Sequence, residues 1–79
     1  MTLPVLYADF NNADARGRVR LNGVGTVRDL GRLGLQLRDG LSVRVHDEQV
    51  EADGEVRYSA DERLWVAEID WAAVRRIAG

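Results

Sequence analysis

The sequence predicts a mostly β fold. We expect a small, strongly bent antiparallel sheet or a partly closed barrel of five or six strands, ending in a short C-terminal helix. Three observations lead to this expectation. Short apolar or alternating apolar–polar runs recur along the chain. Turn residues, mainly glycine, asparagine and aspartate, separate these runs at short intervals. The length of 79 residues allows a single small domain over residues 1–79.

The first third of the chain predicts two strands. The apolar run Leu3–Phe10 indicates a strand that is buried on both faces, or one whose two halves face different layers. The segment Asn11–Asp14 then supplies turn residues. Residues Arg18–Leu21 alternate polar and apolar side chains, which is typical of a half-buried strand.

The segment Thr26–Gly34 has no single interpretation. Thr26 followed by Asp29 resembles a weak helix start, and Leu30 and Leu33 have helical spacing. The two glycines in the segment disfavour a helix by about 1 kcal/mol each relative to alanine. We expect either a single turn of helix or an irregular strand.

The clearest alternation surrounds Asp39-Gly40. Leucines at 33, 35 and 37 alternate with other residues, and apolar side chains at 41, 43 and 45 continue the pattern. A three-residue loop, Arg38–Gly40, keeps these side chains on one face, whereas a two-residue loop does not. We therefore predict a hairpin that pairs residues 35–37 with 41–43, with Gly40 at positive φ in a G1 bulge.

Two further strands follow a turn at Asp47-Glu48. Apolar or small residues fall on even positions throughout Val50–Tyr58, which predicts one long strand bent at Gly54. The next strand is Leu64–Asp70, whose odd-numbered residues are apolar and should face the core.

The C-terminal segment predicts the short helix. Asp70 is a suitable N-cap for a helix over Trp71–Ala78, with Val74 and Ile77 facing inward. Strands, tight turns and one small helix together resemble small barrels of the SH3-like or OB-like kind. The resemblance is one of architecture and implies no function.

Composition limits the class of protein. Hydrophobic residues make up 46% of the chain and charged residues 30%, which is typical of a globular protein. There is no cysteine, so disulfides and thiolate metal sites are excluded. All eleven basic residues are arginine, as in proteins of GC-rich genomes. No signal peptide or membrane-spanning run is evident, which predicts a soluble protein in the cytoplasm.

Charge is unevenly distributed along the chain. The formal net charge is −2. Residues 1–44 contain seven arginines and four aspartates, whereas residues 45–79 contain four arginines and nine acidic residues. The first part therefore has a charge of +3 and the second a charge of −5, a polarity that suits a charged partner or head-to-tail self-association.

Arg16, Arg18 and Arg20 are the candidate contact residues. In a strand they project from one face as a cationic stripe. Three uses remain open for this stripe: a solvated or salt-bridged surface, a protein contact, and a grip on nucleic-acid phosphates. The net negative charge and the presence of only five aromatic residues disfavour a general nucleic-acid binder.

Other polar groupings have ordinary explanations. We identify no catalytic, cofactor-binding or metal-binding residues, because the patterns that such chemistry needs are incomplete. The groupings are His46 with Ser42 on one strand; the acidic pairs Asp47/Glu48, Asp61/Glu62 and Glu68/Asp70; and the oxygen-rich loop of Asp9, Asn11, Asn12 and Asp14.

These observations predict a small, non-enzymatic protein-interaction or adaptor module. Its partner would be another protein or a second copy of itself, with no membrane contact. The alternative is a small barrel that binds nucleic acid through the arginine stripe. An enzyme is the third hypothesis; it would need a pocket lined by Glu68, Asp70 and an arginine, whereas a barrel this small has interior room only for its own side chains.

Overall fold

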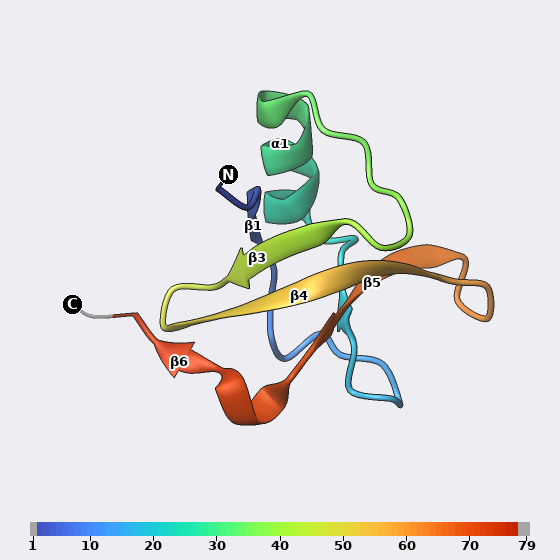
Figure 1. Ribbon diagram of the computed structural model, residues 1–79. Helices are drawn as coiled ribbons and strands as arrows, with labels where there is room; N and C mark the ends of the chain where they lie inside the picture. Colours follow the sequence, from blue (N-terminus) through green and yellow to red (C-terminus); the bar gives the residue numbers. More distant parts are fainter. Residues whose placement is uncertain (1, 78–79) are drawn as a thin grey trace.

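A computed structural model describes residues 2–77, which form a curled sheet with one α-helix at its edge (Figure 1). The elements, in chain order, are β1 (Val5–Tyr7), β2 (Val19–Arg20), α1 (Val24–Leu33), β3 (Ser42–His46), β4 (Val50–Ser59), β5 (Leu64–Ile69), the 3₁₀ turn η1 (Trp71–Ala73) and β6 (Arg75–Arg76). The predicted mostly β fold is confirmed, and so is its strong curl, which gives a half-barrel.

The sheet is organised around its longest strand. The strand order is β1-β3-β4-β5-β2, and β6 also pairs with β4. Val50–Ser59 is a single strand, as the alternation of even positions predicted. The predicted strand at Leu64–Asp70 is confirmed as β5. Because β3, β5 and β6 all pair with β4 in the antiparallel direction, this part of the sheet has the predicted direction.

The prediction of a wholly antiparallel sheet is wrong at β1. This strand runs parallel to β3, with Val5 opposite Arg44 and Tyr7 opposite His46. Parallel neighbours need a long crossover connection, and the segment that contains β2 and α1 provides it. The first strand is also shorter than the predicted Leu3–Phe10 run, and only alternate side chains of it are buried.

The core lies on the concave face of the half-barrel. Its buried members are Leu6, Ala8, Phe10, Val19, Leu21, Val43, Val45, Ala52, Val56 and Ala67. Inward residues alternate along each strand, as the pleat requires. Val66 is also fully buried, but on the other face, where its cross-strand neighbours are Arg20 and Arg57. The stems of such arginines can cover an apolar side chain on a charged face.

The segment after Gly23 forms a full ten-residue helix, not the single turn or irregular strand expected for Thr26–Gly34. Gly34 ends α1 in the left-handed conformation (φ 63°), and its N–H donates to carbonyls of the last turn. Thr26 does not cap the helix start. It lies inside the helix, and its hydroxyl bonds to the neighbouring strand instead. The contacts of α1 with β1 therefore stabilise the helix by more than its glycines destabilise it.

The predicted bulge is confirmed, but its predicted partner is wrong. Gly40 has φ 85° and donates its N–H to the Val56 carbonyl, while the Val56 N–H donates to the Leu41 carbonyl. Two residues thus oppose one, as in a G1 bulge. No strand forms over residues 35–37; Leu35 and Leu37 pack against the core from a loop. The long β4 provides the partner instead.

The predicted C-terminal helix over Trp71–Ala78 is wrong. Asp70 caps a helical turn as expected, accepting a hydrogen bond from the Ala72 N–H at 3.0 Å. The turn lasts only for η1, and the chain then returns as β6 to the edge of β4 that β5 leaves unpaired. Pairing of this open edge takes the place of further helix. Val74 does pack on the core, Ile77 is exposed, and Ala78 lies outside the described residues.

Gly54 supplies a test of the close packing between β4 and β5. A Cβ atom at this position would lie 2.5 Å from the Glu68 carbonyl oxygen, so the backbone would have to move. We expect Gly54→Ala to lower the free energy of unfolding by about 1–3 kcal/mol in urea, followed by tryptophan fluorescence. Gly31→Ala is the matched control, because nothing lies within 4 Å of its Cβ and alanine favours the helix by up to about 1 kcal/mol. Equal stability of the two variants would contradict this account.

Candidate functional site

Arg20 is held by the protein's own acceptors. Its guanidinium donates to both carboxylate oxygens of Glu62, at 2.8 and 2.7 Å, in a bidentate ion pair. It also donates to the Asn12 side chain and the Ala13 carbonyl. Arg20 therefore ties the loop before β2 to the turn between β4 and β5.

Arg18 is also engaged. Its Nε donates to Asp14 at 2.8 Å, and the Asp14 carboxylate accepts the backbone N–H groups of Arg16 and Arg18 as well. Burial raises the pKa of Asp14, but these hydrogen bonds and the Arg18 charge outweigh burial, and the net pKa is lowered. Asp14 thus organises the turn that leads into β2.

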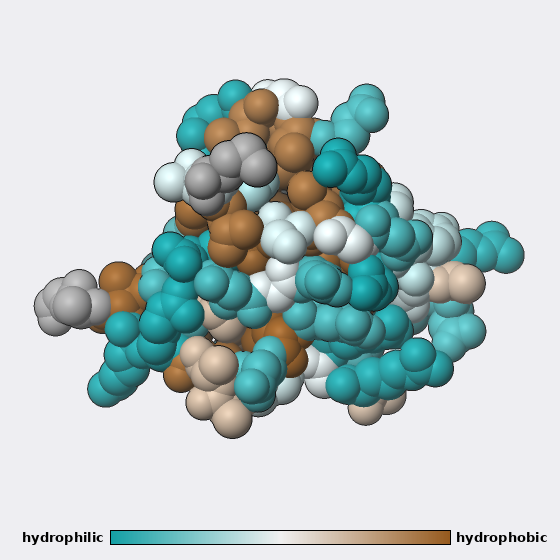
Figure 2. All heavy atoms as spheres, viewed as in Figure 1, coloured by the Kyte–Doolittle hydropathy of each residue, from teal (hydrophilic) through white to brown (hydrophobic). Residues whose placement is uncertain are grey.

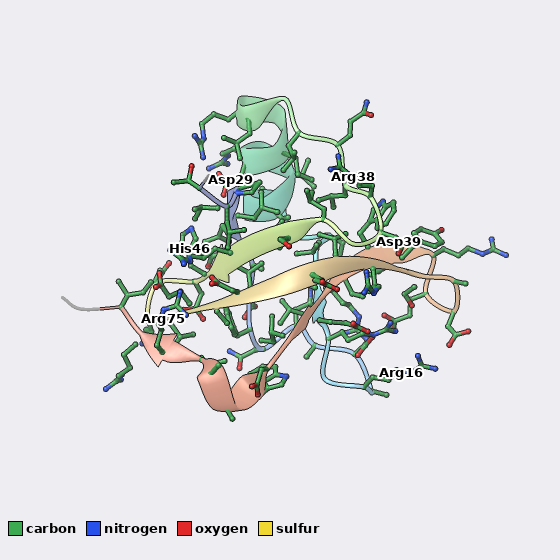
Figure 3. The ribbon with its side chains drawn as sticks, in the orientation of Figure 1. Arg16, Asp29, Arg38, Asp39, His46 and Arg75 are labelled. Carbon is green, nitrogen blue, oxygen red and sulfur yellow. The ribbon has the colours of Figure 1, made fainter. Side chains whose placement is uncertain are left out.

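Arg16 is the member of the predicted stripe that stays exposed. It lies at the tip of the loop before β2 (Figure 3). No acceptor among residues 2–77 bonds to its guanidinium. The hollow beside it, of about 120 Å³, is also lined by Asp14, Asp61 and Glu62. The three arginines of the stripe thus share one region, but two of them are already neutralised.

The convex face carries a network of ion pairs. Arg44 pairs with Asp53, Arg75 with Glu51 and Asp53, and Arg57 with Glu55 and Glu68 (Arg75 is labelled in Figure 3). These side chains alternate with the core residues along β3, β4 and β5. Such exposed pairs contribute little stability each. In these pairs three arginines meet four carboxylates, so the positive charges of the three arginines are compensated.

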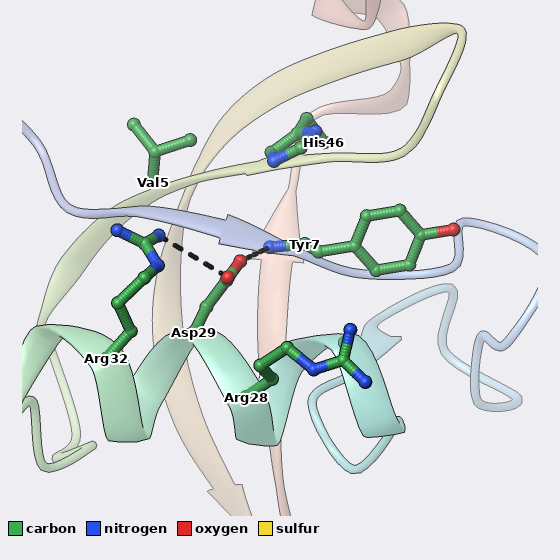
Figure 4. A pocket seen from close by; sticks show the side chains of 7 residues that line it. Val5, Tyr7, Arg28, Asp29, Arg32 and His46 are labelled. Atoms are coloured by element: carbon green, nitrogen blue, oxygen red, sulfur yellow. Dashed lines mark hydrogen bonds and ion pairs between the residues drawn. The ribbon is translucent and has the colours of Figure 1, made fainter.

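The edge of β1 meets α1 through two side chains. Asp29 Oδ2 accepts the Tyr7 N–H at 2.8 Å (Figure 4). The buried Thr26 hydroxyl donates to the Tyr7 carbonyl. We call this pair of bonds the Tyr7 clamp. Gly25 allows it, because a Cβ there would lie 2.6 Å from the Tyr7 ring. At Tyr7 the helix thus supplies the hydrogen bonds that a further strand would otherwise make.

A groove runs along β1 beside the helix. One hollow of about 410 Å³ is lined by Tyr7, Arg28 and His46 among others, and an adjoining one of about 440 Å³ by Leu3, Leu33 and Leu35 among others. Val5 and Arg32 line both hollows. We call the two together the α1–β1 groove. Its walls combine apolar side chains with two arginines of one helix (Figure 4).

The groove is positive along α1 and negative beyond Tyr7. No acceptor among residues 2–77 bonds to Arg28, and Arg32 reaches only Asp29, at 3.4 Å. The Tyr7 ring contacts His46 edge-on, with ring centres 5.7 Å apart. Burial raises the pKa of the Tyr7 hydroxyl, and the charges of Glu48, Asp9 and Asp47 raise it further. Anionic groups are therefore favoured near Arg28 and Arg32 and disfavoured past Tyr7.

The outer side of α1 is unusually apolar. The exposed fraction is 76% for Val24 and 58% for Val27, whereas Thr26 between them is 1% exposed. Polar Thr26 and Asp29 face the protein together with Leu30, which packs against the core, whereas the two valines face solvent. Figure 2 shows apolar side chains gathered at this end of the molecule, over α1 and the N-terminal segment. Val5 and Leu33 are exposed as well, but they lie in the α1–β1 groove.

The other sequence groupings have structural roles. Asp9 and Asp47 accept N–H groups of their own turns, and Asp70 caps η1. His46 Nδ1 lies 3.0 Å from the carbonyl oxygen of its neighbour Asp47. Within residues 2–77, no three histidine, cysteine or acidic side chains are grouped so that they could hold a metal ion.

Sequence reasoning missed the residues of the α1–β1 groove. Arg28 and Arg32 are four residues apart, which would have placed them on one flank of a helix had the helix been predicted. The two glycines concealed that signal. The contribution of β1 and β3 depends on parallel pairing between distant segments, which no local pattern indicates.

Comparisons with known proteins identify no relative. The chain was compared with protein-family models, with curated proteins and with solved structures, and it matches none of them. None of the helices within residues 2–77 has the length and apolarity needed to cross a membrane.

The Tyr7 clamp predicts how α1 is attached. Asp29→Ala leaves the Tyr7 N–H without its partner, so we expect a loss of about 1–3 kcal/mol in stability. Hydrogen exchange at the Tyr7 amide should also become faster in this variant, under conditions in which the protein as a whole stays folded. Arg32→Ala is the control, because it removes only the exposed end of the Asp29 ion pair. Unchanged exchange at Tyr7 in Asp29→Ala would show that the clamp does not hold the helix.

The Arg20–Glu62 pair predicts a dependence on pH. The Arg20 hydrogen bond lowers the pKa of Glu62 from its ordinary value of 4.5. The stabilisation is therefore complete above pH 4.5 and disappears as the pH falls through the lowered pKa of the folded state. We expect Glu62→Gln to lower the urea midpoint at pH 7, and the difference from the parent chain to shrink below pH 4.5. Asp61→Asn, in the same turn, should show no such difference at either pH.

Proposed function

We propose that this chain is a small, non-enzymatic protein-interaction module, and that its contact surface is the end formed by α1 and β1. The observation that carries the proposal is the pair of exposed valines on α1. Val24 and Val27 face solvent, whereas Thr26 and Asp29 face the sheet. A helix that presents apolar side chains outward beside a groove is typical of a docking surface.

The proposed partner is a different protein with an acidic contact surface. In a symmetric dimer formed through α1, the same patch of both copies would meet at the two-fold axis. The arginines at 28 and 32, which flank the patch, would then approach their own copies and repel them. An acidic partner turns the same charges into attraction.

The proposal also covers the kind of barrel and the place where it acts. A curled sheet of short strands resembles the SH3-like and OB-like architectures, many of which serve as binding modules, although the resemblance transfers no function by itself. We place the partner in the cytoplasm, as expected from the sequence.

Nucleic-acid binding through Arg16, Arg18 and Arg20 is the second candidate. It is favoured by the exposed Arg16, which lines two shallow hollows. It is disfavoured by the ion pairs that Arg18 and Arg20 already make. A phosphate backbone would have to displace Asp14 and Glu62 from the two arginines. If these ion pairs stay in place, the phosphates can contact only Arg16 of this stripe.

Paired variants of the patch test the proposed function. We expect the double substitution Val24→Ser and Val27→Ser to abolish capture of a partner from native lysate by the immobilised chain. Both side chains are exposed, so stability should change by less than about 1 kcal/mol. Ile77→Ser, which alters an exposed apolar residue elsewhere, should leave capture intact. A partner that is captured equally by all the variants, or a chain that captures none and forms dimers instead, would contradict the proposal.

A further inference from the structure

The outer edge of β1 is open at one residue. In its parallel pairing with β3, Pro4 accepts from the Arg44 N–H and Ala8 donates to the His46 carbonyl. The backbone groups of Val5 and Tyr7 therefore point away from β3. The Tyr7 clamp occupies those of Tyr7. No group among residues 2–77 bonds the N–H or C=O of Val5.

The residue with the open backbone lines the α1–β1 groove. Val5 lines both hollows of the groove, and its side chain is 43% exposed. An N–H and a C=O on one strand edge can form two hydrogen bonds with an added extended peptide. The groove is thus shaped for a strand beside a helix, as in other proteins that bind peptides by adding a strand.

The charges beside Val5 select the peptide. The Arg32 side chain is 64% exposed and makes one long contact, while Arg28 makes none among residues 2–77. Asp29, the acidic residue of the groove, already accepts from Tyr7 and Arg32. The hollow beside Arg16 differs, because three carboxylates line it. Unneutralised positive charge therefore meets an open strand edge at this groove.

We propose that the α1–β1 groove binds an extended acidic segment of a partner protein, whose backbone pairs with Val5 and whose carboxylates contact Arg28 and Arg32. This inference rests on the proposed function and names the chemistry of the partner. The segment carries its acidic residues above the two arginines and not beyond Tyr7, where Asp9, Asp47 and Glu48 repel them.

The test uses the full chain labelled with ¹⁵N and a blocked octapeptide of alternating glutamate and valine. We expect amide shifts to change at Val5, Leu6 and the second half of α1, and hydrogen exchange at the Val5 amide to slow. The Arg28→Gln, Arg32→Gln variant should bind at least about fivefold more weakly, as expected for the loss of two exposed ion pairs. Arg38→Gln with Arg76→Gln removes the same charge from other exposed arginines and should bind like the parent chain.

Each other outcome overturns the inference. Absence of shifts at millimolar peptide, equal binding of a lysine–valine octapeptide, or equal binding by the Arg28→Gln, Arg32→Gln variant would each do so. Tighter binding of a thymidine oligonucleotide to the same residues would assign the groove to nucleic acid instead. If the peptide fails while partner capture still depends on Val24 and Val27, the proposed function stands and only the acidic segment is wrong.

Discussion

The attachment of α1 to the backbone of Tyr7 is the contact on which the rest of the arrangement depends. A curled sheet that stops at β1 exposes a row of unpaired N–H and C=O groups, which invite pairing with other chains. Asp29 and Thr26 satisfy these groups at Tyr7. The opposite edge is closed in a different way, because residues 12–14 pair with β2 through backbone hydrogen bonds. Only a short part of the β1 edge therefore stays open.

The clamp also decides which side chains the helix shows to solvent. Polar residues of α1 must face the sheet to reach the strand backbone, so the valines of the same helix face outward. A helix of ten residues is marginal by itself and needs tertiary contacts to be stable. Here these contacts are the two hydrogen bonds of the clamp and the packing of Leu30 against the core. The apolar patch and the groove are thus consequences of closing the sheet edge with a helix.

The distribution of the arginines follows from the same architecture. On the convex face, strand pairing places arginines directly opposite acidic residues, and they form ion pairs across the strands. On α1 there is no facing strand. Among residues 2–77, Arg28 has no ion-pair partner and Arg32 pairs with Asp29, which the clamp already uses. At the groove, two uncompensated arginines of one helix therefore lie side by side. In the predicted stripe, the positive charges of Arg18 and Arg20 are compensated by Asp14 and Glu62.

The sequence by itself determined the features that depend on a few neighbouring residues. The alternation over Val50–Ser59, the positive φ of Gly40 and the Asp70 cap were all predictable, because pleat, turn and cap geometries are local. Tertiary structure decided which segments pair. Gly40 lies opposite β4 and not opposite residues 35–37, and β1 pairs in parallel with β3. The C-terminal segment forms β6 on the edge of β4, where a helix had been predicted. Tertiary structure also decided that Thr26–Gly34 belongs to a helix and that the groove lies beside it. These outcomes depend on which distant backbone groups remain unpaired, and no short stretch of sequence contains that information.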